Sequence, residues 1–312
     1  MFPHSYCEFL EPEQSDHTPC LVRMASQSRR APKPFKFFHH TIDHPEYLET
    51  VRNAWNFGTI QGFQQFKLAH SLKLLKPALR SLDARNYSGI SLRVKEQASQ
   101  VALIQRQLLS NPDTETARLE HEERGKLQVL AKAEQKFHRQ KSRNQWHHLG
   151  DRDTTFYHRS VVQRASSNHI HFFRDSGDHM INTAEGIKEH AVDYFTDILG
   201  ETELLSSPAT VDQLREMMDF RCSEGQKVEL MKDVTNEEIT KTVFAMPLSK
   251  SPGPDGYSVE FLRSSWTIVG NDFIAAVQEF FRNGKLLKDL NNTAIVLIPK
   301  HRTRANWESL DR

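Results

Sequence analysis

The chain has 312 residues, of which 38% are hydrophobic and 26% are charged, and its formal net charge is +1 at pH 7. This length is enough for two domains, and the mean hydropathy of −0.62 indicates a modest core with long solvated helices. The small net charge excludes a globally basic or acidic chain, so affinity for nucleic acid would have to come from a local cluster of charge.

Cysteine content and apolar runs exclude further classes of protein. Cys7, Cys20 and Cys222 are too few and too scattered for a disulfide framework or a zinc site, so we expect free thiols in a reducing compartment. No run approaches the roughly 18 apolar residues that span a bilayer, and the N-terminus lacks the pattern of a secretory signal. We therefore expect an intracellular protein, nuclear or cytoplasmic, without a membrane partner.

The first part of the chain is poorly patterned and then becomes helical. The stretch "PCLVRMA" predicts one β-strand with no visible partner, and "SQSRRAPKP" predicts a basic linker broken by prolines. In the helical part, Tyr47, Val51 and Trp55 share one face. The stretch "FQQFKLAHSLKLLKPALRSLDAR" continues with an apolar stripe that begins at Phe63 and Phe66, and Pro77 is expected to kink or restart it.

A second long helical segment runs from about Leu92 to Gln140. The stretch "SNPDTETARLE" interrupts this segment, with Asp113 or Thr114 as a new N-cap. Two or three long antiparallel helices are the natural arrangement for this part of the chain.

Residues 136–164 are locally basic. The stretch "KFHRQKSRNQWHHLGDRDTTFYHRSVVQR" contains seven Lys or Arg and four His against two Asp, with aromatic residues interleaved. Basic side chains neutralise phosphates and aromatic rings stack on bases, so this segment predicts a nucleic-acid contact. The alternative is a solvated helical face whose aromatic residues turn into a core. The residues expected at phosphates are Arg139, Lys141, Arg143, Arg152, Arg159 and Arg164, with Trp146 packing or stacking.

The next segment predicts a small hairpin near residues 169–182, followed by a helix that Thr183 caps and that ends near Leu199. Residues 200–224 are weakly patterned. A capping box of Thr235 and Glu238 then predicts a helix that ends at Pro247.

The stretch "KSPGPDGYS" follows at residues 250–258. It is predicted to be a loop, because so many prolines and glycines exclude helix and central strand. One or two amphipathic helices come next, with Gly284 as the C-cap. The stretch "NTAIVLIPK" predicts an unpartnered strand near 293–298, which would be an aggregation liability.

Catalytic motifs are sparse. Asp16 and His17, in "SDH", have the chemistry of a carboxylate that orients an imidazole. A metal-dependent nuclease needs several further carboxylates, which would have to lie upstream, so no catalysis is expected from this pair. There is no P-loop, dinucleotide fingerprint, His-Glu-x-x-His, Gly-x-Ser-x-Gly or Tyr-Ala-Asp-Asp sequence. Asp255 is interpreted as a turn-forming residue rather than a metal ligand.

Together these stretches resemble the reverse transcriptase of plant LINE-type (non-LTR) retrotransposons. The "KSPGPDG" loop and the "NNTAIVLIPK" strand are similar to the fingers that precede the palm in that family. The stretch "QKSRNQWHHLGDRDTTFYHRSVVQRASSNHI" is similar to its connecting segment, although Asp153 is followed by Thr154 where the family often has Asn. The "SDHTP" stretch is similar to the last motif of the preceding endonuclease. The tail "HRTRANWESLDR" diverges from the family.

The resemblance implies roles for particular residues. Asp16 and His17 match the terminal catalytic pair of the endonuclease and are interpreted as relics. Lys250, Gly253, Asp255 and Gly256 match the fingers loop, where the glycines would permit close approach to a nucleic-acid strand. Lys300 matches the end of the strand that runs near template or incoming nucleotide.

The resemblance also implies a division of the chain. The expected segments are an endonuclease remnant (1–25), a linker (26–44), a helical connector (45–135), a basic segment with a hairpin and helix (136–200), a weakly ordered linker (201–230) and a truncated fingers subdomain (231–312). The predicted fold class is mostly α with minor β (α+β). The palm aspartates are not in this sequence, so we expect an inactive polymerase-like protein that retains RNA or DNA binding through the basic segment.

No cofactor is expected in this chain, although the intact family uses Mg²⁺, and no small-molecule substrate is expected. The oligomeric state stays open. Two alternatives also remain, namely a helical interaction or scaffold protein and the product of a pseudogene that does not fold stably.

Overall fold

The computed structural model describes residues 6–9, 18–23, 34–142, 154–170, 172–175, 177, 179–200, 209–218, 220–299 and 310–311. The chain divides into two compact units, one of residues 29–164 and 234–295 and the other of residues 1–28, 165–233 and 296–312. The predicted fold class, mostly α with minor β, is confirmed. Within the described ranges, no helix combines the length and apolar composition that a membrane crossing requires.

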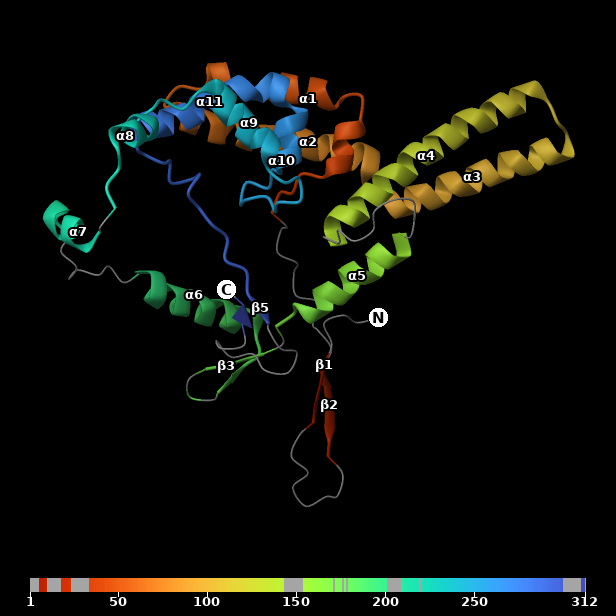
Figure 1. Cartoon of the computed structure of the whole chain (residues 1–312). Helices are drawn as coiled ribbons and strands as arrows, with labels where there is room; N and C mark the ends of the chain where they lie inside the picture. The colour runs from red at the N-terminus through yellow and green to blue at the C-terminus, as the bar shows by residue number, and fades with distance from the viewer. Residues whose placement is uncertain are drawn as a thin grey trace. The chain divides into compact units, whose positions relative to one another are not determined.

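The larger unit, 29–164 with 234–295, is helical (Figure 1). Its elements are η1 (His39–Asp43), α1 (Tyr47–Ala54), η2 (Phe57–Thr59), α2 (Gln64–Tyr87), α3 (Ile90–Ser110), α4 (Thr114–Ser142), α9 (Asn236–Ala245), α10 (Val259–Ser264) and α11 (Trp266–Asn283). Helix α5 (Thr154–Ser167) ends just beyond this unit's boundary.

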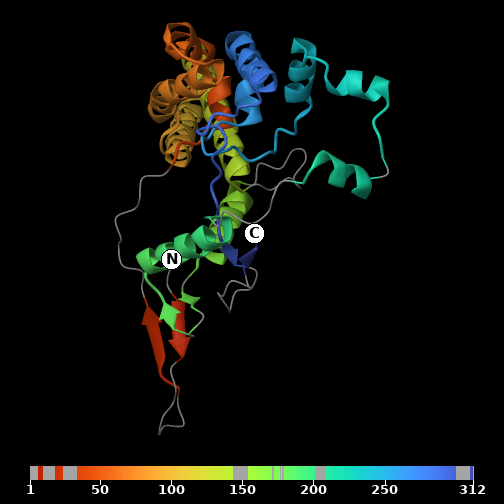
Figure 2. The ribbon, with the colours of Figure 1, turned by 90° about the vertical axis from the view of Figure 1, so that its left-hand side faces the viewer.

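Helix α2 is the centre of the core, with α1 on one side and α11 on another (Figure 2). Leucines recur along α2 at spacings of three and four residues, which places them on one buried face. These leucines are Leu68, Leu72, Leu75, Leu79 and Leu82. Phe63 and Phe66, expected in the same stripe, are instead 75% and 40% exposed. The helix continues through Pro77 rather than restarting there.

Helices α3 and α4 pack side by side as an antiparallel arm (Figure 1). Asp113 begins α4, because its Oδ1 accepts a 2.8 Å hydrogen bond from the backbone N–H of Thr116. The side-chain hydrogen bond with Thr116, and then the backbone one, also lower the pKa of Asp113. At the base of the arm, Tyr87, Ile90 and Ala133 form a small apolar cluster.

Residues 34–44, expected as part of a linker, belong to the core instead. Phe37 is 2% exposed and packs its ring against Phe261 with the centroids 5.4 Å apart. His40 is also buried, and its Nε2 lies 2.8 Å from Asp83 Oδ1 on α2. On the other side, Asp43 pairs with Lys136 of α4 at 2.7 Å. This segment therefore ties the arm to the bundle.

A carboxylate from α11 holds the first turn of α2. The two oxygens of Glu279 accept hydrogen bonds from the backbone N–H groups of Gln64 and Gln65, at 3.0 and 2.9 Å. These amides have no partner inside the helix, and a negative charge at the N-terminus also complements the helix dipole. The contact links residues more than 200 positions apart, so it fixes the C-terminal helices on the connector.

The smaller unit contains β-hairpins and short helices. Its described elements are β1 (Tyr6–Phe9), β2 (Cys20–Arg23), β3 (Phe173–Arg174), β4 (Met180–Ile181), α6 (Ala184–Gly200), α7 (Val211–Met217), α8 (Glu224–Leu230), β5 (Ile298–Pro299) and β6 (Leu310–Asp311). The strands form three antiparallel pairs, β1 with β2, β3 with β4 and β5 with β6.

Three expectations about these elements need correction. Strand β2 has a partner, because Tyr6–Phe9 pairs with it from Tyr6 opposite Arg23 to Phe9 opposite Cys20. The predicted strand near 293–298 reduces to Ile298–Pro299, which pairs with Leu310–Asp311. Residues 209–230 contain two helices, each begun by a capping box that the weak apolar pattern concealed, Thr210 with Gln213 and Ser223 with Gln226.

Candidate functional site

The loop of residues 250–258 is held against the core by its second half. Tyr257 is buried, and its hydroxyl donates a 2.9 Å hydrogen bond to the backbone carbonyl of Leu72 on α2. Burial raises the pKa of this phenol, so it remains a donor. The Oδ1 of Asp255 accepts the N–H of Tyr257 at 3.2 Å, the turn geometry expected of this residue. The loop is therefore a preformed part of the surface.

Gly256 makes the closest backbone approach in this loop. Its φ is +81°, and a Cβ there would stand 2.0 Å from the carbonyl oxygen of Phe35. Its own carbonyl accepts a 2.9 Å hydrogen bond from the N–H of Phe37. At this position, glycine therefore permits close approach of the loop to residues 35–37 of the same chain, rather than the expected approach to a nucleic-acid strand. Gly253 has no comparable contact, since a Cβ there would meet Asp255 at an ordinary 3.5 Å.

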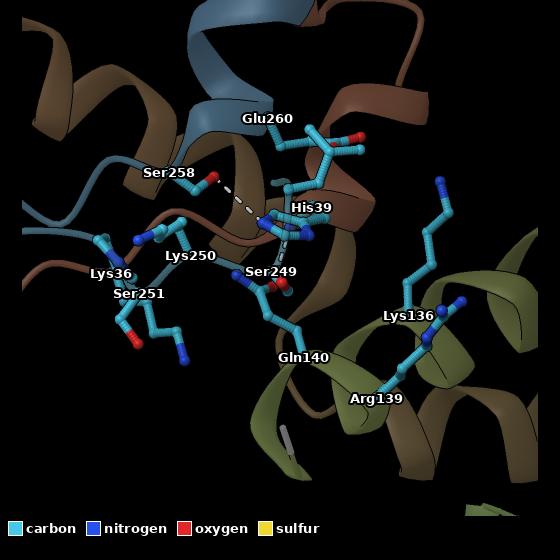
Figure 3. Close-up of a pocket in the computed structure, with 12 residues that line it drawn as sticks. Lys36, His39, Lys136, Arg139, Gln140, Ser249, Lys250, Ser251, Ser258 and Glu260 are labelled. Atoms are coloured by element: carbon cyan, nitrogen blue, oxygen red, sulfur yellow. Dashed lines mark hydrogen bonds between the residues drawn. The ribbon is translucent and has the colours of Figure 1, made fainter. Parts of the chain in front are cut away.

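A cavity of about 530 Å³ opens where this loop, residues 36–39 and the last turns of α4 meet. Four cationic side chains line it: Lys36, Lys136, Arg139 and Lys250. Figure 3 shows Lys36 and Lys250 on one side of His39, and Lys136 and Arg139 on the other. We call this site the basic cavity. Three separate segments contribute its charges, so it exists only in the folded chain.

The charges of the basic cavity are only partly compensated. Glu260 is the one acidic side chain in its lining, and Lys136 is paired with Asp43. Arg139 and Lys250 are exposed, and neither forms an ion pair with any other residue that the structure describes. Two unpaired cations at one concave site favour binding of an anion.

His39 lies in the middle of the basic cavity (Figure 3). Its Nε2 is 3.1 Å from Ser258 Oγ, and its backbone N–H donates a 3.0 Å hydrogen bond to Gln140. Burial, with the positive charges of Lys36 and Lys136 as further causes, lowers the pKa of His39 to about 4. The imidazole is therefore neutral at pH 7, and the N–H of its protonated ring nitrogen is the group that can donate a hydrogen bond to a bound oxyanion.

The other residues expected to bind phosphate lie in different places. Lys141 places its ammonium 4.5 Å from the centroid of the Phe137 ring, a cation–π contact. Arg164 donates a 2.8 Å hydrogen bond to the carbonyl of Ser142, which links α5 to the end of α4. Arg159 is exposed on α5. The remaining predicted residues lie outside the described part of the chain: Asp16, His17, Arg143, Trp146, Arg152 and Lys300.

The basic cavity also contains residues that the motifs did not indicate, namely Lys36, His39 and Lys136. The alternation of Phe35, Lys36 and Phe37 is a signal that could have found Lys36, because it buries Phe37 and leaves Lys36 partly exposed in the cavity lining. No group of three His, Cys, Asp or Glu side chains that could hold a metal ion occurs among the residues described.

Comparison with known proteins finds a distant relative whose sequence matches almost the whole of this chain. The chain is 24% identical over 309 residues to the transposon TX1 uncharacterized 149 kDa protein of Xenopus laevis. The match covers 94% of this chain and 23% of that protein, so the chain spans about a quarter of the length of its relative. No protein-family model matches. The chain is thus distantly similar to a transposon protein, which supports a transposon-related origin.

Proposed function

We propose that the chain is a segment of a LINE-type retrotransposon protein and that its basic cavity binds the phosphate backbone of a nucleic acid. The similarity to the TX1 transposon protein supports this origin. The "KSPGPDGYS" and "NNTAIVLIPK" stretches favour the segment that joins an endonuclease to the fingers of a reverse transcriptase. A Xenopus relative does not favour a plant element in particular.

One observation carries the binding proposal. Arg139, from the segment expected to bind phosphates, and Lys250, from the loop that resembles polymerase fingers, line the same cavity although 111 positions separate them. Lys36 and Lys136 add charge from two further positions. A phosphodiester carries one negative charge per nucleotide, so a strand that crosses the cavity would meet several cations at once. The net charge of +1 means that this attraction is local to the site.

The test is fluorescence anisotropy with labelled single-stranded RNA and DNA. The charge variant is Arg139→Gln with Lys250→Gln. Its matched control is Lys95→Gln with Arg106→Gln, which removes the same charge from exposed positions on α3. Loss of two single-strand phosphate contacts weakens affinity roughly 20-fold at 0.1 M salt.

We expect that loss for the charge variant and no comparable loss for the control. Equal affinities of the two variants would assign any binding to general charge rather than to the basic cavity. A folded wild-type chain that binds neither oligonucleotide at low salt would contradict the proposal and favour a helical interaction protein.

A further inference from the structure

A second cavity lies on the other side of the 250–258 loop. Its volume is also about 530 Å³, and its walls come from α2, α9, α10, α11, the loop itself and residues 286–292. The lining is mainly apolar and includes the rings of Phe273 and Phe280 and the side chain of Leu286. We call it the apolar cavity. Proteins that bind single-stranded nucleic acid combine an apolar, partly aromatic surface for the bases with a cationic surface for the backbone.

The two cavities share one wall. Lys250, Ser251, Pro252 and Ser258 line both of them. Two hydrogen bonds at the end of the loop hold this wall in place. Tyr257 donates one to the backbone of α2, and the carbonyl of Gly256 accepts the other from Phe37, which lies outside the loop. Prolines at 252 and 254 restrict the backbone further. A ligand therefore meets a preformed ridge with cations on one side and apolar groups on the other.

We propose that this ridge binds one nucleotide unit of a single strand, with a phosphate in the basic cavity and the base in the apolar cavity. The inference rests on the proposed function, and it adds that an unpaired, accessible base contributes to affinity. Charge complementarity selects the occupant, because the cations beside the ridge attract the phosphates that carry the base. A duplex keeps its bases stacked inside, so it would use the basic cavity alone.

Phe280 and Phe281 offer a matched pair of variants. Phe280 lines the apolar cavity, whereas its neighbour Phe281 does not and is 60% exposed. Phe280→Leu removes the ring from the cavity and keeps an apolar side chain of similar size, and Phe281→Leu makes the same change outside it. Leu286→Ser provides a second variant at a 48% exposed lining position, should Phe280→Leu unfold the chain by circular dichroism.

The probes are a labelled 12-mer of deoxythymidine and an abasic 12-mer with the same phosphates. For the wild-type chain we expect the deoxythymidine strand to bind about tenfold more tightly, the scale of one base stacked on an aromatic ring. Phe280→Leu and Leu286→Ser should shrink that ratio severalfold, and Phe281→Leu should preserve it.

The possible failures separate the two proposals. Equal, salt-sensitive binding of the two probes by the wild-type chain would overturn the nucleotide site and leave the basic cavity standing. A ratio that falls equally in Phe280→Leu and Phe281→Leu would also overturn it. Absence of binding to either probe would overturn both proposals.

Discussion

Replacement of Gly256 by alanine tests whether the loop is held as described. The φ of +81° costs a side-chain-bearing residue about 1–2 kcal/mol. A Cβ at 2.0 Å from the Phe35 carbonyl oxygen, which is backbone, forces the two segments apart. That movement loses the hydrogen bond from Phe37, worth about 1 kcal/mol, and strains the packing of the Phe37 ring by about 1–3 kcal/mol. We expect Gly256→Ala to lower the free energy of unfolding by about 3–6 kcal/mol.

The assay is urea unfolding followed by circular dichroism at 222 nm, where most of the signal is helical. Gly253→Ala is the control in the same loop, because its new Cβ makes only an ordinary contact at 3.5 Å and should change stability by less than about 0.5 kcal/mol. Since the loop positions Lys250, Gly256→Ala should also weaken oligonucleotide binding in the absence of urea. Superimposable unfolding curves for the two variants would refute this account of the loop.

Three further changes probe the same unit. Tyr257→Phe removes the buried hydrogen bond to Leu72 and should cost about 1–2 kcal/mol of unfolding free energy; an unchanged urea midpoint would mean that the bond does not stabilise the loop. Glu279→Gln removes the charge at the N-terminus of α2 and should lower the free energy of unfolding by about 1 kcal/mol. A thermal midpoint equal to that of the wild type would contradict this prediction. His39 has a folded pKa of about 4, below its ordinary 6.5, so the unfolded state binds more protons between these values. The contribution of neutral His39 to the free energy of unfolding should therefore be fully present above pH 6.5 and decrease as the pH drops toward 4. Urea titrations at several pH values should show a weaker pH dependence for His39→Asn than for the wild type.

Local signals in the sequence predicted much of the helical architecture. The capping box of Thr235 and Glu238 and the left-handed Gly284 stand where expected, because both depend on neighbouring residues only. Asp113 likewise begins α4 as its position before the helix indicated. Pro77 shows the limit of such signals, since the core contacts of the flanking leucines hold α2 together through it.

Long-range contacts could not be predicted in this way. Residues 34–44 look like a linker because prolines and basic residues precede them, yet Phe37 is buried by partners more than 200 positions away. The same distance conceals the basic cavity, since nothing local to Lys36 or Arg139 indicates that Lys250 lies beside them. Strand β1 was missed because a pair of short strands is defined by its register and not by either sequence alone.

The salt dependence of single-strand binding tests the central claim most directly. The logarithm of the binding constant should fall linearly with the logarithm of salt concentration, with a slope of about −0.7 for each phosphate that the protein neutralises. Arg139→Gln with Lys250→Gln should make that slope shallower by about 1.4, while Lys95→Gln with Arg106→Gln should leave it unchanged. If the slopes of the wild-type chain and both variants coincide, the cations of the basic cavity do not contact phosphates.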